Sequence, residues 1–397
     1  LDAGATLIEC DAARQQTRRI ARADELEMHW TLPLDNQLSF SRDGQRLYFG
    51  MREAADEAPE EEESDFDILD VEALLEERGL DVWHYQDPRI KTNEKSTFED
   101  RSEHLFLAVV HRDTGAVVRG SGPETENVAR PDEGTIALGR DPRPYLRERT
   151  WDGWYEDIWA VDLADGTREP VATRVQDTVS RSPKGSYIAW FADDHFHLYD
   201  GATGQTRTLT QGLGVSFANE DHDYPRSTPD YGVGGWLRDE SAVLLYDKYD
   251  IWLIPTGIGK ARLLTGGMGR EEGRIYRIID FHDGPEGLAL DQDLLLTGFD
   301  ELAKNSSIWT VDLAGQELER RREDDRYYNV RAKAKDADRY LYSEEAYDVF
   351  YDLWVTDGEF RKPKQLTDLN PQLDDFDLGE ATLVDWVKAV SYTHLRA

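Results

Sequence analysis

The chain has 397 residues, 39% of them hydrophobic, which is enough to bury a large core. It holds 81 Asp and Glu against 46 Lys and Arg, and its formal net charge of −35 argues against DNA or RNA as a partner because phosphate backbones would be repelled. A solvated surface explains this acidity, and so does a halophilic source. The single cysteine, Cys10, excludes an intramolecular disulfide.

The composition favours an all-β protein. The 11 Trp, 18 Tyr and 13 Phe, with 31 Gly and 15 Pro, predict many strands and turns rather than a helical bundle. No apolar run approaches the ~18 residues needed to cross a bilayer, so we expect no membrane span. The sequence does not decide between a periplasmic and a cytoplasmic location. The chain starts at Leu1 rather than Met, so its natural N-terminus is expected to be missing.

The first predicted elements are a strand, a polar turn and a strand within residues 4–21, which we interpret as the outer half of an incomplete unit. Residues 40–50, "FSRDGQRLYFG", then show a charged turn that leads into an alternating apolar strand, the signature of a hairpin. Residues 52–79 interrupt this pattern as an acidic insertion. Its first part is expected to be flexible, and residues 67–79 could form a short amphipathic helix.

The stretch after the insertion, residues 81–89 or "DVWHYQDPR", alternates in a way that is typical of a strand. We interpret it as a blade strand in which Trp83 packs between sheets and which ends at Pro88. The alternative is a surface that contacts a substrate or a neighbouring domain, formed by Trp83, His84, Tyr85 and Asp87. A catalytic role for His84 is disfavoured because no nucleophile lies near it in the sequence.

A repeat runs through the rest of the chain. Its core is a polar residue, an apolar residue and an aromatic residue, followed by strand formers, Asp and a Gly turn, as in "EDIWAVDLADG" and "SSIWTVDLAG". Four short antiparallel strands at a period of roughly 40–55 residues are typical of β-propeller blades, and we predict about seven blades, the first incomplete, with eight also possible. We expect the recurring tryptophans to fill the space between blades: Trp159, Trp252, Trp309 and Trp354.

The sequence contains no Gly-x-Ser-x-Gly elbow, P-loop, Rossmann fingerprint, His-Glu-x-x-His or paired-cysteine motif. A hard metal at His222 and its neighbouring acids, or zinc at His195 and His197, is conceivable, but neither spacing matches a known site. The pairs Glu344–Glu345 and Asp374–Asp375 are expected to be solvated, although a Glu pair could hold the α-amine of a peptide. We therefore predict neither a metal nor a cofactor.

Four segments resemble the N-terminal β-propeller of bacterial prolyl oligopeptidase family serine peptidases: "LSFSRDGQRLYFG", "DVWHYQDPRI", "DYPRSTPDYGVGGWLRDESAVLLYDKYDIWLIP" and "LWVTDGEFRKPKQLTDLNPQL". "WHYQDPR" and the later "LVDW" are the more specific elements, since the turns "SxDGxxL" also occur in TolB-like propellers. The resemblance spans residues 4–386 and implies a propeller that filters the access of short peptides by size. It also implies an α/β-hydrolase domain in cis, downstream, that carries the Ser, Asp and His of the triad.

No residue of this chain matches the triad motifs, so the resemblance implies no catalytic residue here, and we expect the chain alone to be inactive. The alternative function is a stand-alone TolB-like propeller that binds proteins or glycans. We expect the propeller to occupy residues 1–388. Residues 389–397, "AVSYTHLRA", look like the translated sequencing adapter found at the ends of some metagenomic gene fragments, and they are expected to be non-native.

Overall fold

The computed structural model describes residues 6–11, 15–22, 30–53, 83–281, 286–314 and 317–379, together with Thr382 and Val384. The helix predicted within residues 67–79 and the tail 389–397 lie outside this described part. The chain divides into two compact units, residues 1–213 with 221–230, and residues 214–220 with 231–397. Within the described residues, no helix is long and apolar enough to cross a membrane.

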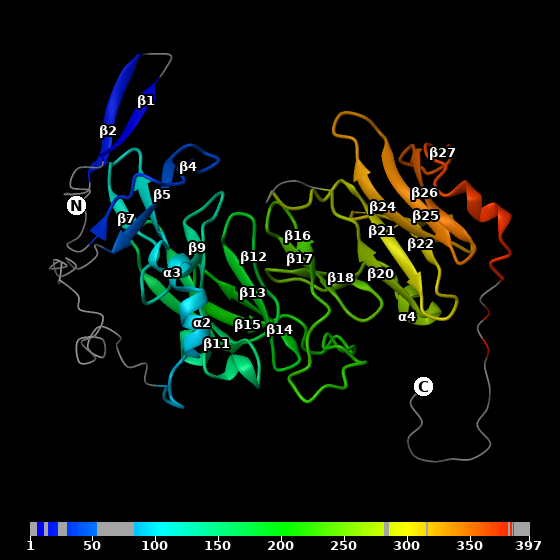
Figure 1. The fold of residues 1–397 in the computed structure, drawn as a ribbon, viewed down its shortest axis with the longest axis horizontal. Helices are drawn as coiled ribbons and strands as arrows, with labels where there is room; N and C mark the ends of the chain where they lie inside the picture. The colour runs from blue at the N-terminus through cyan, green and yellow to red at the C-terminus, as the bar shows by residue number, and fades with distance from the viewer. Residues whose placement is uncertain are drawn as a thin grey trace, which may run out of the picture. The chain divides into compact units, whose positions relative to one another are not determined.

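The first unit is built from antiparallel sheets (Figure 1). A two-stranded sheet joins β1 (Thr6–Asp11) and β2 (Gln16–Arg22). The next sheet has the order β3-β5-β6-β7, with β4 also beside β5: β3 (Trp30–Thr31), β4 (Ser39–Phe40), β5 (Arg46–Glu53), β6 (Phe106–His111) and β7 (Val117–Arg119). Two four-stranded sheets follow: β8 (Asn127–Ala129), β9 (Ile136–Asp141), β10 (Glu156–Asp162) and β11 (Arg168–Val175); then β12 (Val179–Arg181), β13 (Tyr187–Ala192), β14 (His195–Asp200) and β15 (Gln205–Thr208).

The second unit contains three four-stranded sheets, each in chain order. They are β16 (Val233–Trp236), β17 (Ala242–Tyr246), β18 (Ile251–Pro255) and β19 (Arg262–Leu263); β20 (Arg274–Ile278), β21 (Asp293–Asp300), β22 (Ser306–Asp312) and β23 (Leu318–Glu323); and β24 (Tyr327–Lys333), β25 (Tyr340–Ala346), β26 (Val349–Thr356) and β27 (Lys364–Gln365). The short helix α4 (Met268–Glu272) precedes β20, and a 3-10 helix spans Pro371–Asp375.

Tight turns join the strands of each sheet. Between β13 and β14, Ala192 pairs with His195, and the two intervening residues Asp193 and Asp194 have φ of 51° and 64°. Two successive residues with positive φ form a type I′ turn, whose twist matches that of the flanking strands, and Asp tolerates this conformation better than most residues. Polar turn residues therefore set the register that puts alternate apolar side chains on the buried faces.

The cores lie between successive sheets. Ile158 of β10 and Ile188 of β13 belong to one buried cluster, and Leu244 of β17 and Leu296 of β21 belong to another. A third cluster joins the sheets β20–β23 and β24–β27. Four-stranded meanders that bury their faces against the next meander are blades of a β-propeller, since one such sheet cannot cover both of its own faces. The all-β, propeller-type prediction is confirmed, with the hairpin β1–β2 as the predicted incomplete unit.

The recurring tryptophans contribute to these cores as predicted. Trp309 and Trp252 are only 5% and 9% exposed. Trp309 meets the ring of Tyr276 edge to face at 5.4 Å and donates from Nε1 to Ser307 at 2.8 Å. Trp159 and Trp354 are partly buried against clusters that each join two successive sheets. The prediction that these side chains pack between blades is confirmed for Trp159, Trp309 and Trp354, whereas Trp252 is buried beside Phe217 and donates to Asp247.

Candidate ligand-binding cleft

The segment Trp83–Ile90 is not a strand, so the prediction of a blade strand there is wrong. Local hydrogen bonds replace ladder pairing: the backbone N–H of Asp87 donates to the His84 carbonyl at 2.9 Å, and the His84 N–H donates to the Asp87 carboxylate at 2.9 Å. The Gln86 N–H also donates to His84 Nδ1 at 3.1 Å. Trp83 does not pack between sheets, because 60% of it is exposed, and Tyr85 is 77% exposed.

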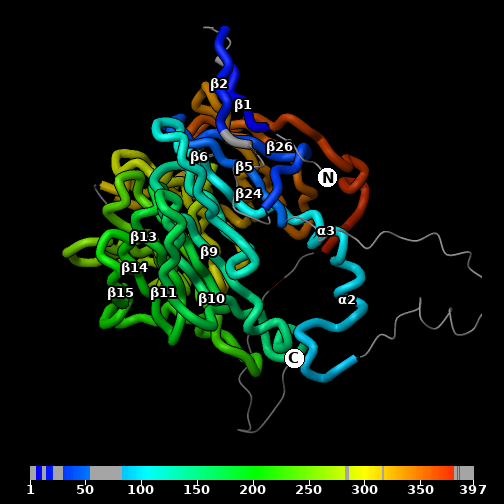
Figure 2. The backbone as a smooth tube through the Cα atoms, turned by 90° about the vertical axis from the view of Figure 1, so that its left-hand side faces the viewer, coloured from blue at the N-terminus to red at the C-terminus, as the bar shows by residue number. Residues whose placement is uncertain are grey.

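Asp87 anchors this segment to the helix that follows. Lys91 starts α2 (Lys91–Ser96), and its ammonium lies 4.0 Å from the Asp87 carboxylate and 3.0 Å from that of Glu94. A second short helix, α3 (Phe98–Ser102), continues from α2, and both lie along one side of the first unit (Figure 2). Asp87 is therefore engaged inside the protein, whereas the rings of the segment are left open.

The opposite wall comes from the connection between β9 and β10. This connection forms two 3-10 helices, Arg143–Tyr145 and Glu148–Thr150. Arg143 fixes its start, since Nε and Nη2 each donate to the Asp141 carboxylate at 2.7 Å, and this pairing raises the pKa of Arg143. Its end presents Trp151 and Trp154, which are 70% and 66% exposed.

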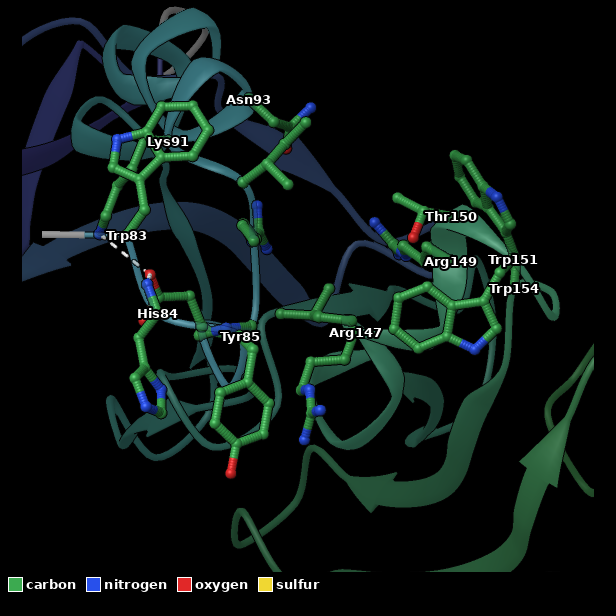
Figure 3. A pocket seen from close by; sticks show the side chains of 15 residues that line it. Trp83, His84, Tyr85, Lys91, Asn93, Arg147, Arg149, Thr150, Trp151 and Trp154 are labelled. Atoms are coloured by element: carbon green, nitrogen blue, oxygen red, sulfur yellow. Dashed lines mark hydrogen bonds and ion pairs between the residues drawn. The ribbon is translucent and has the colours of Figure 1, made fainter.

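The two walls enclose a cleft of about 370 Å³, within the size range of small-ligand sites. Figure 3 shows Trp83, His84 and Tyr85 on one side and Trp151 and Trp154 on the other, with Arg147 between the two sets. The cleft is also lined by Asp87, Pro88, Arg89, Ile90, Lys91, Asn93, Leu146, Arg149 and Thr150. The structure thus brings together all four residues predicted as contact candidates: Trp83, His84, Tyr85 and Asp87.

The cleft is cationic in a strongly acidic protein. Burial lowers the pKa of Arg89, and the nearby charges of Arg101 and Arg149 lower it further. Arg149 lies over the ring of Trp154 at 4.5 Å, and its Nε is buried without a hydrogen-bond partner in the described part of the chain. Within that same part, no ion pair joins a carboxylate to Arg89, Arg147 or Arg149. The guanidinium groups of Arg89, Arg147 and Arg149 therefore line this cleft without an ion pair among the described residues, although the charges of Glu126 and Glu94 act on Arg89.

The second wall was not among the predicted contact residues. Residues 147–154, "RERTWDGW", place two Arg and two Trp outside the blade repeat, and this combination of cations and rings in a loop was the available signal. Ring side chains that follow no strand period have no blade face to fill. They are therefore candidates for a binding surface.

The other candidate groups do not form a site. His195 contacts Thr210 at 3.1 Å, and His197 contacts the Ala192 carbonyl at 3.1 Å and stacks on Trp190. His222 lies 3.3 Å from the Arg226 carbonyl. Among the residues that the structure describes, no group of three or more His, Cys, Asp or Glu side chains could hold a metal ion.

One of the acidic pairs differs from its prediction. Glu344 is not solvated: it is buried and accepts a hydrogen bond from Arg322 at 2.9 Å, because its strand position points into the sheet interface. Its neighbour Glu345 is exposed, as are Asp374 and Asp375. Alternation along β25 separates the two glutamates, so they do not act as a pair.

No protein-family model and no curated protein matches this sequence. Similar solved structures include a prolyl endopeptidase, at 12% identity over 92% of this chain and 46% of that chain (TM-score 0.36). An oligogalacturonate lyase from Vibrio parahaemolyticus is 9% identical over 93% of this chain and 86% of that chain (TM-score 0.37). An acylaminoacyl peptidase from Pyrococcus horikoshii is 13% identical over 94% of this chain and 51% of that chain (TM-score 0.34). The chain spans about half the length of the two peptidases. These similarities do not place it in a family.

Proposed function

We propose that this chain is the propeller part of a serine peptidase of the prolyl oligopeptidase family, and that it controls the access of short peptides and contacts them at the aromatic cleft. One observation carries the proposal. The element "WHYQDPR", among the more specific in its resemblance to that family, forms an exposed wall of a cleft instead of a core strand. Because the element neither pairs in a sheet nor fills a core, the exposed rings of Trp83 and Tyr85 are available for recognition.

The chemistry of such an enzyme would lie outside this chain. Acyl transfer needs a serine activated by a histidine, a carboxylate that orients the histidine, and backbone donors for the oxyanion. We assign these groups to an α/β-hydrolase domain in cis. The role of the propeller is then to bind, filter and orient the peptide, and we propose no catalytic residue in it.

The alternative is a stand-alone binding module in the manner of TolB-like propellers. One observation favours it: both walls of the cleft come from the first unit, between residues 83 and 154, so the cleft is complete without a second domain. In that case the ligand would be a protein segment or a glycan, and no acyl transfer would follow binding.

The uninterrupted gene separates the two functions. We expect the reading frame to continue past Trp386 for a domain of roughly 250 residues, a typical size for one large α/β domain, with Gly-x-Ser-x-Gly, then Asp, then His. A stop codon soon after Trp386 would contradict the peptidase proposal. The purified 397-residue chain should not hydrolyse aminoacyl-proline or acyl-peptide reporters, and hydrolysis that persists after contaminants are removed would also contradict it.

A further inference from the structure

We propose that the cleft selects acidic peptide segments, whose carboxylates pair with Arg89, Arg147 and Arg149 while adjacent apolar side chains pack against its rings. This inference rests on the proposed peptide contact and adds the chemical class of the peptide. Its basis is the contrast between the negative net charge of the chain and the positive charge of the cleft. A chain with a formal net charge of −35 leaves three guanidinium groups at one cleft without an ion pair in its described part.

The polar groups of the cleft are mostly donors. Guanidinium and ammonium groups have no acceptor atom, and Lys91 already holds the two carboxylates of Asp87 and Glu94. Asp87 itself accepts from the His84 N–H. A ligand that contacts Arg89, Arg147 and Arg149 therefore needs acceptor atoms. Carboxylates suit them best, because charged acceptors form shorter and stronger hydrogen bonds with the planar guanidinium fork.

The rest of the lining is apolar. Two indoles lie on the wall opposite Trp83 and Tyr85, and Pro88, Ile90 and Leu146 add aliphatic surface. Large rings cover apolar side chains of a ligand with little loss of conformational entropy, which is why Tyr and Trp are frequent in recognition surfaces. The cleft thus combines contacts for apolar groups and for anions within about 370 Å³.

A peptide fits this combination better than other anions. A nucleic acid would bring a row of phosphates against the whole field of an acidic protein, whereas one or two carboxylates act mainly on charges within a Debye length of about 10 Å at 0.1 M salt. A neutral oligosaccharide brings no charged acceptor, and the guanidinium groups of this cleft form their strongest hydrogen bonds with charged acceptors. Acidic residues beside apolar ones in a peptide supply both halves of the required chemistry.

The test is calorimetric titration of the 397-residue chain in 50 mM NaCl with two probes, acetyl-Ala-Phe-Glu-Glu-Phe-Ala-amide and its analogue with Gln in place of both Glu. We expect the acidic probe to bind about tenfold more tightly, because each charge-assisted pair is stronger than its neutral counterpart. The double variant Arg147→Gln/Arg149→Gln should abolish this preference. The variant Arg361→Gln, which changes a 73% exposed arginine of the other unit, should retain it.

Three results would overturn the inference: equal affinity for both probes, a preference that survives in the double variant, or tighter binding of trigalacturonate or a hexathymidylate than of the acidic probe. Matching circular dichroism spectra ensure that the variants are folded. If both probes bind equally, only the acidic preference fails and the peptide contact stands. If neither binds, the peptide contact of the proposed function fails as well.

Discussion

The tryptophans of this protein form two groups that differ in environment. Trp252 and Trp309 lie on blade strands and are buried. Trp83, Trp151 and Trp154 lie in connections outside the repeat and are mostly exposed. The first group follows the period of the sheet and is buried, whereas the second group follows no period and gathers at one cleft.

The position of a ring relative to the repeat, and not its type, decides here whether the ring is buried or exposed. Burying a large ring is a major source of stability, whereas a cluster of exposed rings contributes little to it. Such a cluster is typical of a binding surface. The distinction between buried and exposed tryptophans would be wrong if both groups stabilised the fold equally, or if neither responded to a ligand.

The largest expected effect is on stability. Trp309→Ala should reduce the free energy of unfolding by about 3–5 kcal/mol, because it removes a buried indole, its contact with Tyr276 and its hydrogen bond to Ser307. Trp151→Ala is the matched control and should change it by less than about 0.5 kcal/mol. Urea unfolding followed by circular dichroism measures both. Comparable losses in the two variants would erase the distinction between the groups.

A smaller effect should separate two adjacent glutamates. Glu344→Gln should lower the free energy of unfolding by roughly 2 kcal/mol, because it leaves the partly buried charge of Arg322 with only the more distant carboxylate of Asp324, 4.0 Å away. Glu345→Gln changes the exposed neighbour on the other face of β25 and should have an effect of less than about 0.5 kcal/mol. The same urea titration compares them, and a larger effect for Glu345→Gln would show that the register assigned to β25 is wrong.

The smallest stability effect concerns pH. Burial and the nearby charge of Asp230 raise the pKa of Asp177 to about 6, against the opposing effect of Arg226 and His222. Because the folded-state pKa is raised, the stabilising contribution of protonated Asp177 is complete below pH ~4 and is lost as the pH rises through 6. Asp177→Asn should therefore stabilise the protein at pH 7.5, by about 1 kcal/mol for a half-buried carboxyl, and change little at pH 4.

Thermal unfolding between pH 4 and 7.5 measures this effect. Asp165→Asn serves as a control of opposite sign, since hydrogen bonds from the N–H and hydroxyl of Thr167 lower the pKa of Asp165. That contribution is present at neutral pH and lost as the pH falls. Destabilisation of Asp177→Asn at pH 7.5 would contradict the assigned environment.

The blades could be predicted from sequence because turn residues and apolar alternation act locally. The turn "SPKGS" before β13, for example, contains Gly185 with φ of 80°, a conformation that glycine adopts readily. The fate of residues 83–90 could not be predicted. Their alternation is typical of a strand, but hydrogen bonds between His84 and Asp87 close the segment on itself. Burial of Glu344 likewise depends on Arg322, which lies on another strand, β23.

One of the two walls of the cleft could therefore be predicted from the sequence. The contact candidates from Trp83 to Asp87 were named because three ring side chains adjoin an aspartate. The wall that contains Arg149 and Trp154 was not, because only the fold brings the β9–β10 connection beside residues that precede it by about sixty positions. The packing of the sheets brings these two segments together, and neither segment alone carries a sequence pattern that would predict it.

The central claim is that rings outside the repeat bind ligand while rings inside it hold the blades together. The most direct measurement is fluorine NMR of the chain labelled with 5-fluorotryptophan at its 11 Trp positions, with signals assigned by single Trp→Phe variants. Saturation with the acidic probe peptide should shift the signals of Trp83, Trp151 and Trp154 and leave those of Trp252 and Trp309 in place. Shifts confined to the strand tryptophans, or no shift at all at saturation, would contradict the account.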